Sequence, residues 1–240
     1  RLTDVTGVQT CALPIFWRAN APEPAVTLPE DSSQDSTSYL AFAPDNTALF
    51  VVPTLQDDKN RSYFKVRRVA LDSGAVAAEF TLEGEDVVPK TLQVDQKDGI
   101  VAVGTHNGKI ALLDAVTLEQ RLYITKGHSS NIVHIAFNSD STRMATASTD
   151  LTFKLWDVGE GREILTLQDA SRTATGILPL PEWIAFSPDD RQLITLATTG
   201  KNVVPPIVLH AFPWDLEAYP PAETIEDRVE AFKRAYWRSE

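Results

Sequence analysis

Three polar residues that could form a hydrolytic site lie close together in the second half of the chain. His128, Ser148 and Asp150 are a general base, a hydroxyl nucleophile and a carboxylate, which is the residue set used in acyl transfer. Such a nucleophile usually sits on a sharp turn between a strand and a helix, and no such elbow accompanies Ser148. We therefore expect these residues to have a structural role and the chain to contain no catalytic residue.

The candidates for metal or phosphate chemistry are weaker. His106, His134 and His210 lie in separate repeats and lack the short spacing of metal ligands. The segment Gly104–Gly108 lacks the Gly-Lys-Ser/Thr ending of a phosphate-binding loop and precedes a strand pattern. Cys11 is the single cysteine, so the sequence has neither a disulfide framework nor a cysteine metal site. We expect no metal and no cofactor.

The composition is that of a soluble globular protein and excludes several classes of partner. The chain has 240 residues, of which 43% are hydrophobic and 23% are charged. Because 33 acidic residues outnumber 22 basic ones, the net charge is -11, which disfavours binding to phosphate backbones or anionic lipid. No apolar run approaches the roughly 20 residues that span a bilayer, and the first residues lack the pattern of a signal peptide. We expect a cytoplasmic protein that binds neither nucleic acid nor membranes.

A pattern of four short strands dominates the segment 127–167. Apolar residues alternate in the runs 132–137, 143–147, 152–156 and 163–167, and polar turns separate these runs. Alternation with a period of two and turns about every ten residues are typical of antiparallel strands. The segment is therefore predicted to form a four-stranded meander.

The same pattern recurs along the chain. It is found in 88–124, in 37–82 with a polar insertion at 56–61, and in 183–212 with a proline-containing detour before Ile207–Phe212. Trp17 to Leu28 has the spacing of Trp156 to Leu167, so the pattern is expected to begin inside the third strand of a repeat. Beyond these repeats, Thr224 to Trp237 has apolar residues at helical spacing and predicts a short amphipathic helix.

Gly127-His128, Asp150 and Trp156-Asp157 follow one another at the spacing of a WD repeat. On these residues the chain resembles the WD-repeat (WD40) family over about residues 17–212. The resemblance implies an all-β fold, a partial (open) WD40 β-propeller of about four four-stranded antiparallel blades, followed by the short C-terminal helix. It also implies a hydrogen-bonded structural tetrad of His128, Thr146 (or Ser148), Asp150 and Trp156.

The other repeats match that pattern less well. In the 88–124 repeat, Asn107 stands at the Asp position and Leu113 at the Trp position. We expect this repeat to lack the tetrad and to keep only its apolar layers.

The resemblance implies a non-catalytic scaffold that binds protein partners on the rim of the propeller. The alternative that it leaves open is a C-terminal sensor or regulatory propeller of a larger bacterial signalling or defence enzyme, such as a kinase, an NTPase or a caspase-like protease. An enzyme built on the propeller would need polar ligands converging on its central channel. The matching first-strand positions are expected at Leu40, Leu92, Val133 and Ile184, which are all apolar, and this argues against such an enzyme.

Three segments make up the expected domain organisation. Residues 1–15 resemble a translated sequencing adapter, most clearly at Val5–Ile15, and are expected to be a non-native leader. Residues 16–212 form the propeller fragment and residues 213–240 a C-terminal extension. An open arc of this kind would expose apolar faces and unpaired strand edges at its two ends.

Overall fold

The computed structural model describes residues 15–17, 24–27, 39–56, 61–82, 87–168 and 180–198. Every helix or strand assigned in these ranges is a β-strand, so none of the described residues belongs to a helix that could span a membrane. The strands are β1 (Ile15–Trp17), β2 (Pro24–Thr27), β3 (Tyr39–Phe42), β4 (Ala48–Val52), β5 (Thr54–Gln56), β6 (Ser62–Ala70), β7 (Val76–Leu82), β8 (Pro89–Val94), β9 (Ile100–Thr105), β10 (Ile110–Asp114), β11 (Gln120–Ile124), β12 (Ile132–Phe137), β13 (Arg143–Ser148), β14 (Thr152–Asp157), β15 (Arg162–Gln168), β16 (Leu180–Phe186) and β17 (Leu193–Thr198).

The strands form antiparallel sheets that follow the chain order, as the sequence predicts. We name β3–β7 blade 1, β8–β11 blade 2 and β12–β15 blade 3; the strand pairs β1–β2 and β16–β17 form two further, two-stranded sheets. Blades 2 and 3 have four strands each, at the segments predicted from the repeats. The expected strand at 207–212 and the expected helix at 224–237 lie outside the described residues.

Blade 1 differs from the other blades because its second strand is divided. Strands β4 and β5 both pair with the long strand β6, and Pro53 separates them. Proline has no backbone N–H to donate, so the hydrogen-bond ladder loses a donor at Pro53. Blade 1 is therefore a four-stranded blade whose second strand is broken. The predicted polar insertion begins at Gln56, the last residue of β5, and ends at Arg61, just before β6; residues 57–60 lie outside the described residues.

One β-bulge recurs in every pair of third and fourth strands. In β14–β15 it follows Leu155 and lies at Trp156; in β10–β11 it lies at Leu113, in β6–β7 at Val69 and in β1–β2 at Trp17. In all four pairs, one step along the third strand corresponds at the bulge to two steps along the fourth strand. The register thus places Trp17 and Trp156 at equivalent positions and shows that β1–β2 is a pair of third and fourth strands.

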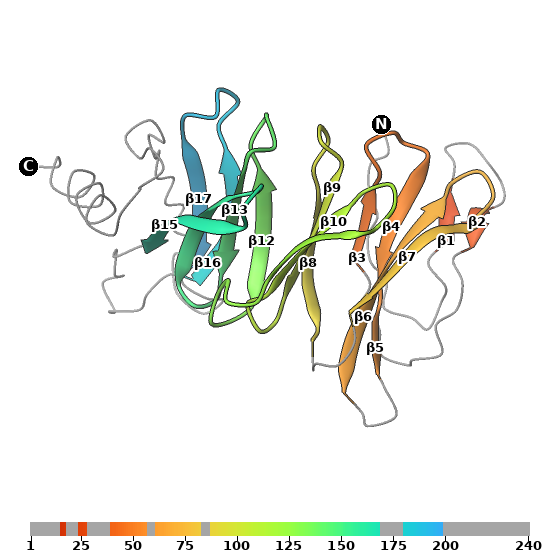
Figure 1. Cartoon of the computed structure of the whole chain (residues 1–240), viewed down its shortest axis with the longest axis horizontal. Helices are drawn as coiled ribbons and strands as arrows, with labels where there is room; N and C mark the ends of the chain where they lie inside the picture. The colour runs from red at the N-terminus through yellow and green to blue at the C-terminus, as the bar shows by residue number, and fades with distance from the viewer. Residues whose placement is uncertain are drawn as a thin grey trace, which may run out of the picture.

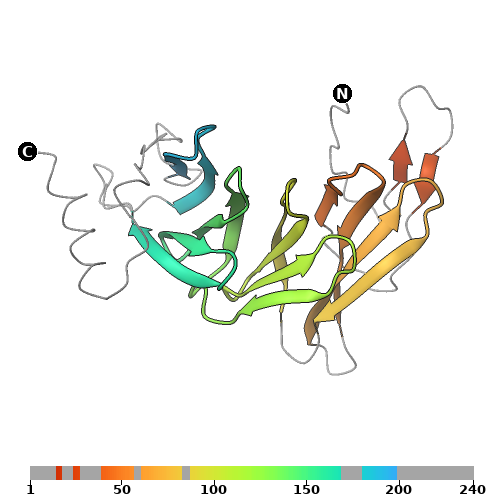
Figure 2. The ribbon, with the colours of Figure 1, turned by 45° about the horizontal axis from the view of Figure 1, so that its top comes forward.

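The blades stack face to face into an arc, with the first strands β3, β8, β12 and β16 adjacent to one another. Apolar clusters fill the spaces between blades 1 and 2, between blades 2 and 3, and between blade 3 and β16–β17. Figures 1 and 2 show that β1–β2 and β16–β17 lie at opposite ends of this arc and that the arc is open. The fold is an open, partial β-propeller.

Candidate functional site

The structure brings the four residues of the expected tetrad together in blade 3. His128 lies in the turn before β12, Thr146 in β13, Asp150 in the turn between β13 and β14, and Trp156 in β14. The distance between His128 Nδ1 and Asp150 Oδ2 is 3.0 Å, and that between His128 Nε2 and Thr146 Oγ1 is 2.7 Å. The indole Nε1 of Trp156 donates to Thr146 Oγ1 at 2.9 Å. These contacts form one continuous chain of hydrogen bonds.

The direction of each hydrogen bond follows from the number of protons available. The indole of Trp156 can only donate, so Thr146 Oγ1 accepts a hydrogen bond from it. The Thr146 hydroxyl in turn donates a hydrogen bond to His128 Nε2. His128 then carries its proton on Nδ1 and donates to the Asp150 carboxylate. Because His128, Thr146 and Trp156 are buried, breaking any one of these links would leave a donor or acceptor unpaired away from water.

Asp150 also closes the turn between β13 and β14. Its Oδ2 accepts from the backbone N–H of Ser129 at 2.9 Å, and its Oδ1 accepts from the backbone N–H and the hydroxyl of Thr152 at 3.0 and 2.6 Å. Ser148, the alternative to Thr146, bonds elsewhere: its hydroxyl accepts from the Asp150 N–H at 3.1 Å and donates to the Ser130 carbonyl at 3.4 Å. Between the two alternatives, Thr146 is therefore the residue that contacts His128 and Trp156.

Two glycines let the tetrad contact the neighbouring blade, which the sequence analysis missed. The N–H of His128 donates to the carbonyl of Gly108, in the turn between β9 and β10 of blade 2, at 2.8 Å. A Cβ on Gly108 would lie 1.9 Å from the His128 carbonyl oxygen, and a Cβ on Gly127 would lie 2.6 Å from the Gly108 carbonyl oxygen. The sequence analysis considered Gly108 only as the end of a segment that is not a phosphate-binding loop; the close approach between blades depends on a stacking that no local pattern encodes.

Burial and hydrogen bonding set the charge states at this site. Burial lowers the pKa of His128 below its usual value, and the nearby Asp150 carboxylate only partly offsets this effect. Burial alone would raise the pKa of Asp150, but the hydrogen bonds from Thr152 and Ser129 and the proximity of His128 outweigh it, so its pKa is lowered. Near neutral pH the site therefore holds a neutral imidazole beside an ionised carboxylate.

Blade 2 lacks the hydrogen-bonded chain. At the equivalent turn, Asn107 Oδ1 accepts from the Thr105 hydroxyl at 2.8 Å, and the buried Leu113 stands at the position of Trp156. The apolar layers around Leu113 remain.

The other histidines that the structure describes, His106 and His134, do not gather into a metal site. His106 Nδ1 accepts from the backbone N–H of Val88 at 3.1 Å, and the ring of His134 lies 5.7 Å from that of Trp183. His210 lies outside the described residues, and no group of three or more potential ligands is found in the part of the chain that the structure describes.

One of the expected first-strand positions is wrong. When the first strands are aligned by their pairing with the second strands, Leu40, Leu92 and Ile184 are equivalent to Ile135 and not to Val133. The bulge between Ile132 and His134 has counterparts in β8 and β16, so it does not shift β12 relative to them; the run Ile135-Ala136-Phe137 matches Ile184-Ala185-Phe186. Ile135 is also apolar and is buried, so the first-strand positions still lack the polar ligands that an enzyme site in the channel would need.

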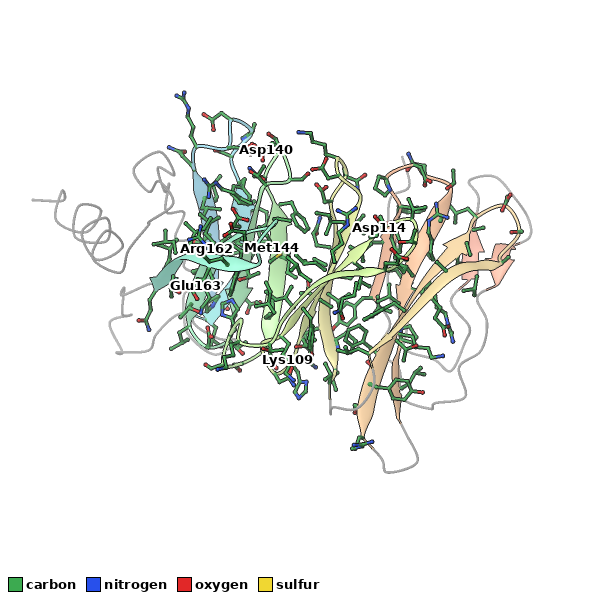
Figure 3. The ribbon with its side chains drawn as sticks, in the orientation of Figure 1. Lys109, Asp114, Asp140, Met144, Arg162 and Glu163 are labelled. Atoms are coloured by element: carbon green, nitrogen blue, oxygen red, sulfur yellow. The ribbon has the colours of Figure 1, made fainter. Side chains whose placement is uncertain are left out.

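Turns at opposite ends of the strands form two rims. Figure 3 shows Asp140, between β12 and β13, and Lys109, between β9 and β10, at opposite ends of the blades. On the rim of Asp140, polar side chains link neighbouring blades: Ser141 Oγ donates to Asp95 Oδ2 at 2.8 Å, and the Ser139 N–H donates to Asp190 at 3.0 Å. On the rim of Lys109, a shallow hollow of about 400 Å³ lies over the tetrad, with Lys126 in its lining.

Replacing Asp150 with alanine is expected to destabilise the protein by roughly 1–3 kcal/mol, because the donors of Ser129, Thr152 and His128 lose a shared acceptor. The matched control is Asn107→Ala in the equivalent turn of blade 2, which should cost less. Urea denaturation followed by circular dichroism measures both free energies of unfolding. Equal losses would contradict a special role for Asp150.

Acidification is expected to destabilise the protein below about pH 6.5. The unfolded chain binds a proton at His128 near the ordinary value of 6.5, whereas the folded protein resists protonation there; burial lowers the pKa of His134 in the same direction. Since the unfolded state then binds more protons, stability falls as the pH drops. Asp150 adds a further loss below its ordinary value of 3.8. Denaturation midpoints from pH 7.5 to 5 should decrease less steeply in His128→Asn; parallel curves would contradict this origin.

Comparison with known proteins agrees with the fold. A family model described as "WD domain, G-beta repeat" matches residues 119–157, which include β11 and the first three strands of blade 3. Mouse transducin beta-like protein 2 is 39% identical over 87 residues, covering 35% of this chain and 19% of that protein. One of the subunits of chicken chromatin assembly factor 1 is 35% identical over 80 residues, covering 32% of this chain and 14% of that protein. The chain thus spans less than a fifth of the length of either relative.

A solved structure supports the same conclusion on the fold. The crystal structure of RRP9 WD40 repeats aligns with a TM-score of 0.54 at 17% sequence identity and covers 70% of this chain and 47% of that one. Together with the repeated blades and the Gly127-His128 to Trp156-Asp157 spacing, these similarities show that the chain has a WD repeat at residues 119–157 and a WD40-type propeller fold.

Proposed function

We propose that the chain is a non-catalytic scaffold that binds protein partners on the rims of its propeller. The observation that carries this proposal is the use of the polar cluster in blade 3. Both ring nitrogens of His128 are occupied by hydrogen bonds, and the ring is buried. A histidine held in this way has no free nitrogen to act as a general base on a substrate. The polar groups that could have done chemistry instead hold the turns of a rigid blade.

The exposed turns are the surface that the fold offers to a partner. Loops on a rigid scaffold commonly carry binding function, and the chicken relative is named as part of a chromatin assembly factor. The two rims differ in the side chains they present: Asp98 and Asp140 are exposed on one, and Lys126 is exposed on the other. A partner should therefore distinguish the two rims by charge.

The experiment is affinity capture from a native lysate with quantitative mass spectrometry. It compares the unchanged chain with two matched variants, Asp98→Lys/Asp140→Lys on one rim and Lys109→Glu/Lys126→Glu on the other. Each variant must melt like the parent. The proposal expects a small set of proteins that one variant loses and the other retains. Equal binding to all three chains, or a catalytic turnover that copurifies with the chain and is lost in His128→Asn, would contradict it.

A further inference from the structure

His134 lies in the seam between blade 3 and the strand pair β16–β17. It stands on β12 opposite Ala147 of β13, two residues before Ala136, so both side chains lie on the same face of the strand. Ala136 packs on the apolar cluster between blade 3 and β16–β17. The ring of His134 lies 5.7 Å from that of Trp183 on β16, and the two planes are tilted by 50°. The imidazole therefore belongs to the contact between these two sheets.

The hydrogen bonding of this imidazole is incomplete. Its Nδ1 is buried and has no hydrogen-bond partner among the described residues. A hydrogen bond with the backbone of Ile184 on β16 favours the protonated ring, so the ring donates in it and Nε2 carries the proton. The neutral ring thus keeps Nδ1 as a bare acceptor. A second proton would place an unpaired N–H and a positive charge away from water.

The charged residues around this seam do not offset the cost of that proton. Burial lowers the pKa of His134 below its usual value, and the bond with Ile184 offsets this only in part; no charged side chain contributes to the shift. The strands packed on β12 and β16 carry charged side chains at Lys90, Arg143, Lys154, Asp157 and Glu182. Glu182, which precedes Trp183, is exposed, and its carboxylate accepts from the hydroxyl of Thr198 at 3.1 Å.

The seams between blades 1 and 2 and between blades 2 and 3 differ from this one. By register, His134 is equivalent to Tyr39 of blade 1 and Thr91 of blade 2. Threonine does not titrate, and burial raises the pKa of Tyr39 above its ordinary value of 10.0. Both ring nitrogens of His128 are hydrogen-bonded, one of them to the carboxylate of Asp150. Mild acid therefore creates an unpaired buried charge in the seam with β16–β17 and not in the other two.

We propose that His134 is a pH switch, in which protonation of Nδ1 separates β16–β17 from blade 3 below about pH 6.5 while blades 1–3 stay folded. Separation lets water reach Nδ1, and a seam in a stack of blades can open while the others stay closed. The separated state binds the extra proton more readily than the closed state, so its population grows as the pH falls. Opening also uncovers the apolar residues Val133, Ala136 and Phe186 of the seam, a surface that only the acidified protein would offer to a partner.

The test is hydrogen exchange of the full chain, followed by mass spectrometry at pH 7.5 and 5.5 and corrected for the pH dependence of the chemical exchange rate. The proposal expects the opening of β16 and β17 to increase by about three- to tenfold, since one proton gives at most about tenfold per pH unit below 6.5. The strands of blade 2 should show a smaller increase. In His134→Gln, which keeps a donor and does not titrate, the excess in β16 and β17 should disappear. His106→Gln is the matched control, because His106 lies in blade 2 with its Nδ1 bonded to the Val88 N–H, and it should keep the excess.

A second measurement needs no variant. Proton NMR of the ring C–H of His134, assigned through its contact with the Trp183 ring, gives the titration midpoint of this histidine in the unchanged chain. The proposal expects a midpoint below the ordinary value of 6.5. A midpoint at or above that value, an equal loss of protection in all blades at pH 5.5, or an acid response of β16 and β17 that persists in His134→Gln would overturn the proposal.

Discussion

Replacing Gly108 with alanine is expected to cost at least ~4 kcal/mol of folding free energy, at the upper end of single-substitution effects. The backbone of Gly108 has a φ of 78°, which a residue with a Cβ adopts only under strain. In addition, the new Cβ would lie 1.9 Å from the carbonyl oxygen of His128. That atom belongs to the backbone of the next blade, so the clash can be relieved only by moving blades 2 and 3 apart.

The matched control is Gly99→Ala, which separates strain from collision. Gly99 also has a positive φ, of 60°, but its nearest neighbour, Ala115 Cβ, would be 3.5 Å from the added atom. Only the backbone penalty of about 1–2 kcal/mol then applies. Chemical denaturation of both variants measures the difference. Similar losses at the two positions would show that blades 2 and 3 are not held together through Gly108.

Replacing Trp156 with alanine is expected to destabilise the protein by about 3–5 kcal/mol. The ring of Trp156 is 2% exposed and belongs to the apolar cluster between blades 2 and 3, and its indole N–H is bonded to Thr146. The substitution therefore removes a large buried side chain and also deprives the Thr146 hydroxyl of a donor. The free energy of unfolding, from urea denaturation followed by circular dichroism, checks this value.

Two milder variants divide that loss into packing and hydrogen bonding. Trp156→Phe keeps most of the buried ring and removes the N–H, whereas Thr146→Val removes the acceptor from the same bond. If the bond couples these residues, the double variant should be less destabilised than the sum of the single ones by ~1 kcal/mol. Strict additivity would show that Trp156 stabilises the blade by packing alone.

Much of the fold was predictable because strand alternation is a local property. The strands of blade 3 fall within one residue of the alternating runs at each end, and the equivalence of Trp17 with Trp156 is confirmed by the shared bulge. Leu118 shows the limit: the apolar pattern at the end of the 88–124 repeat would start the last strand there, but Leu118 has a φ of 58° in a turn, and the strand begins at Gln120. The Asp114 carboxylate stabilises this turn by accepting hydrogen bonds from the backbone N–H groups of Val116 and Thr117. The alternation of apolar residues does not predict a turn of this kind.

The site was predictable only in part, for a similar reason. His128, Asp150 and Trp156 are marked by their spacing in the family pattern, and the choice between Thr146 and Ser148 needed the hydrogen bonds. The mismatch at Val133 could have been avoided from the sequence, because the run Ile135-Ala136-Phe137 recurs as Ile184-Ala185-Phe186 and aligns Ile135 with Ile184. Contacts between blades, such as that of Gly108 with His128, depend on packing between segments and leave no local mark in the sequence.

The hydrogen-bonded chain is present in blade 3 and absent from blade 2, so the two blades should not open together. In stacked repeats each unit contacts only its neighbours, and its local stability can differ from theirs. Native-state hydrogen exchange should therefore find the slowest backbone amides in β13 and β14, around Thr146 and Trp156. The amides of β9 and β10 should exchange through a separate opening of lower free energy. The arc would then lose protection one blade at a time, with blade 3 as the last ordered unit.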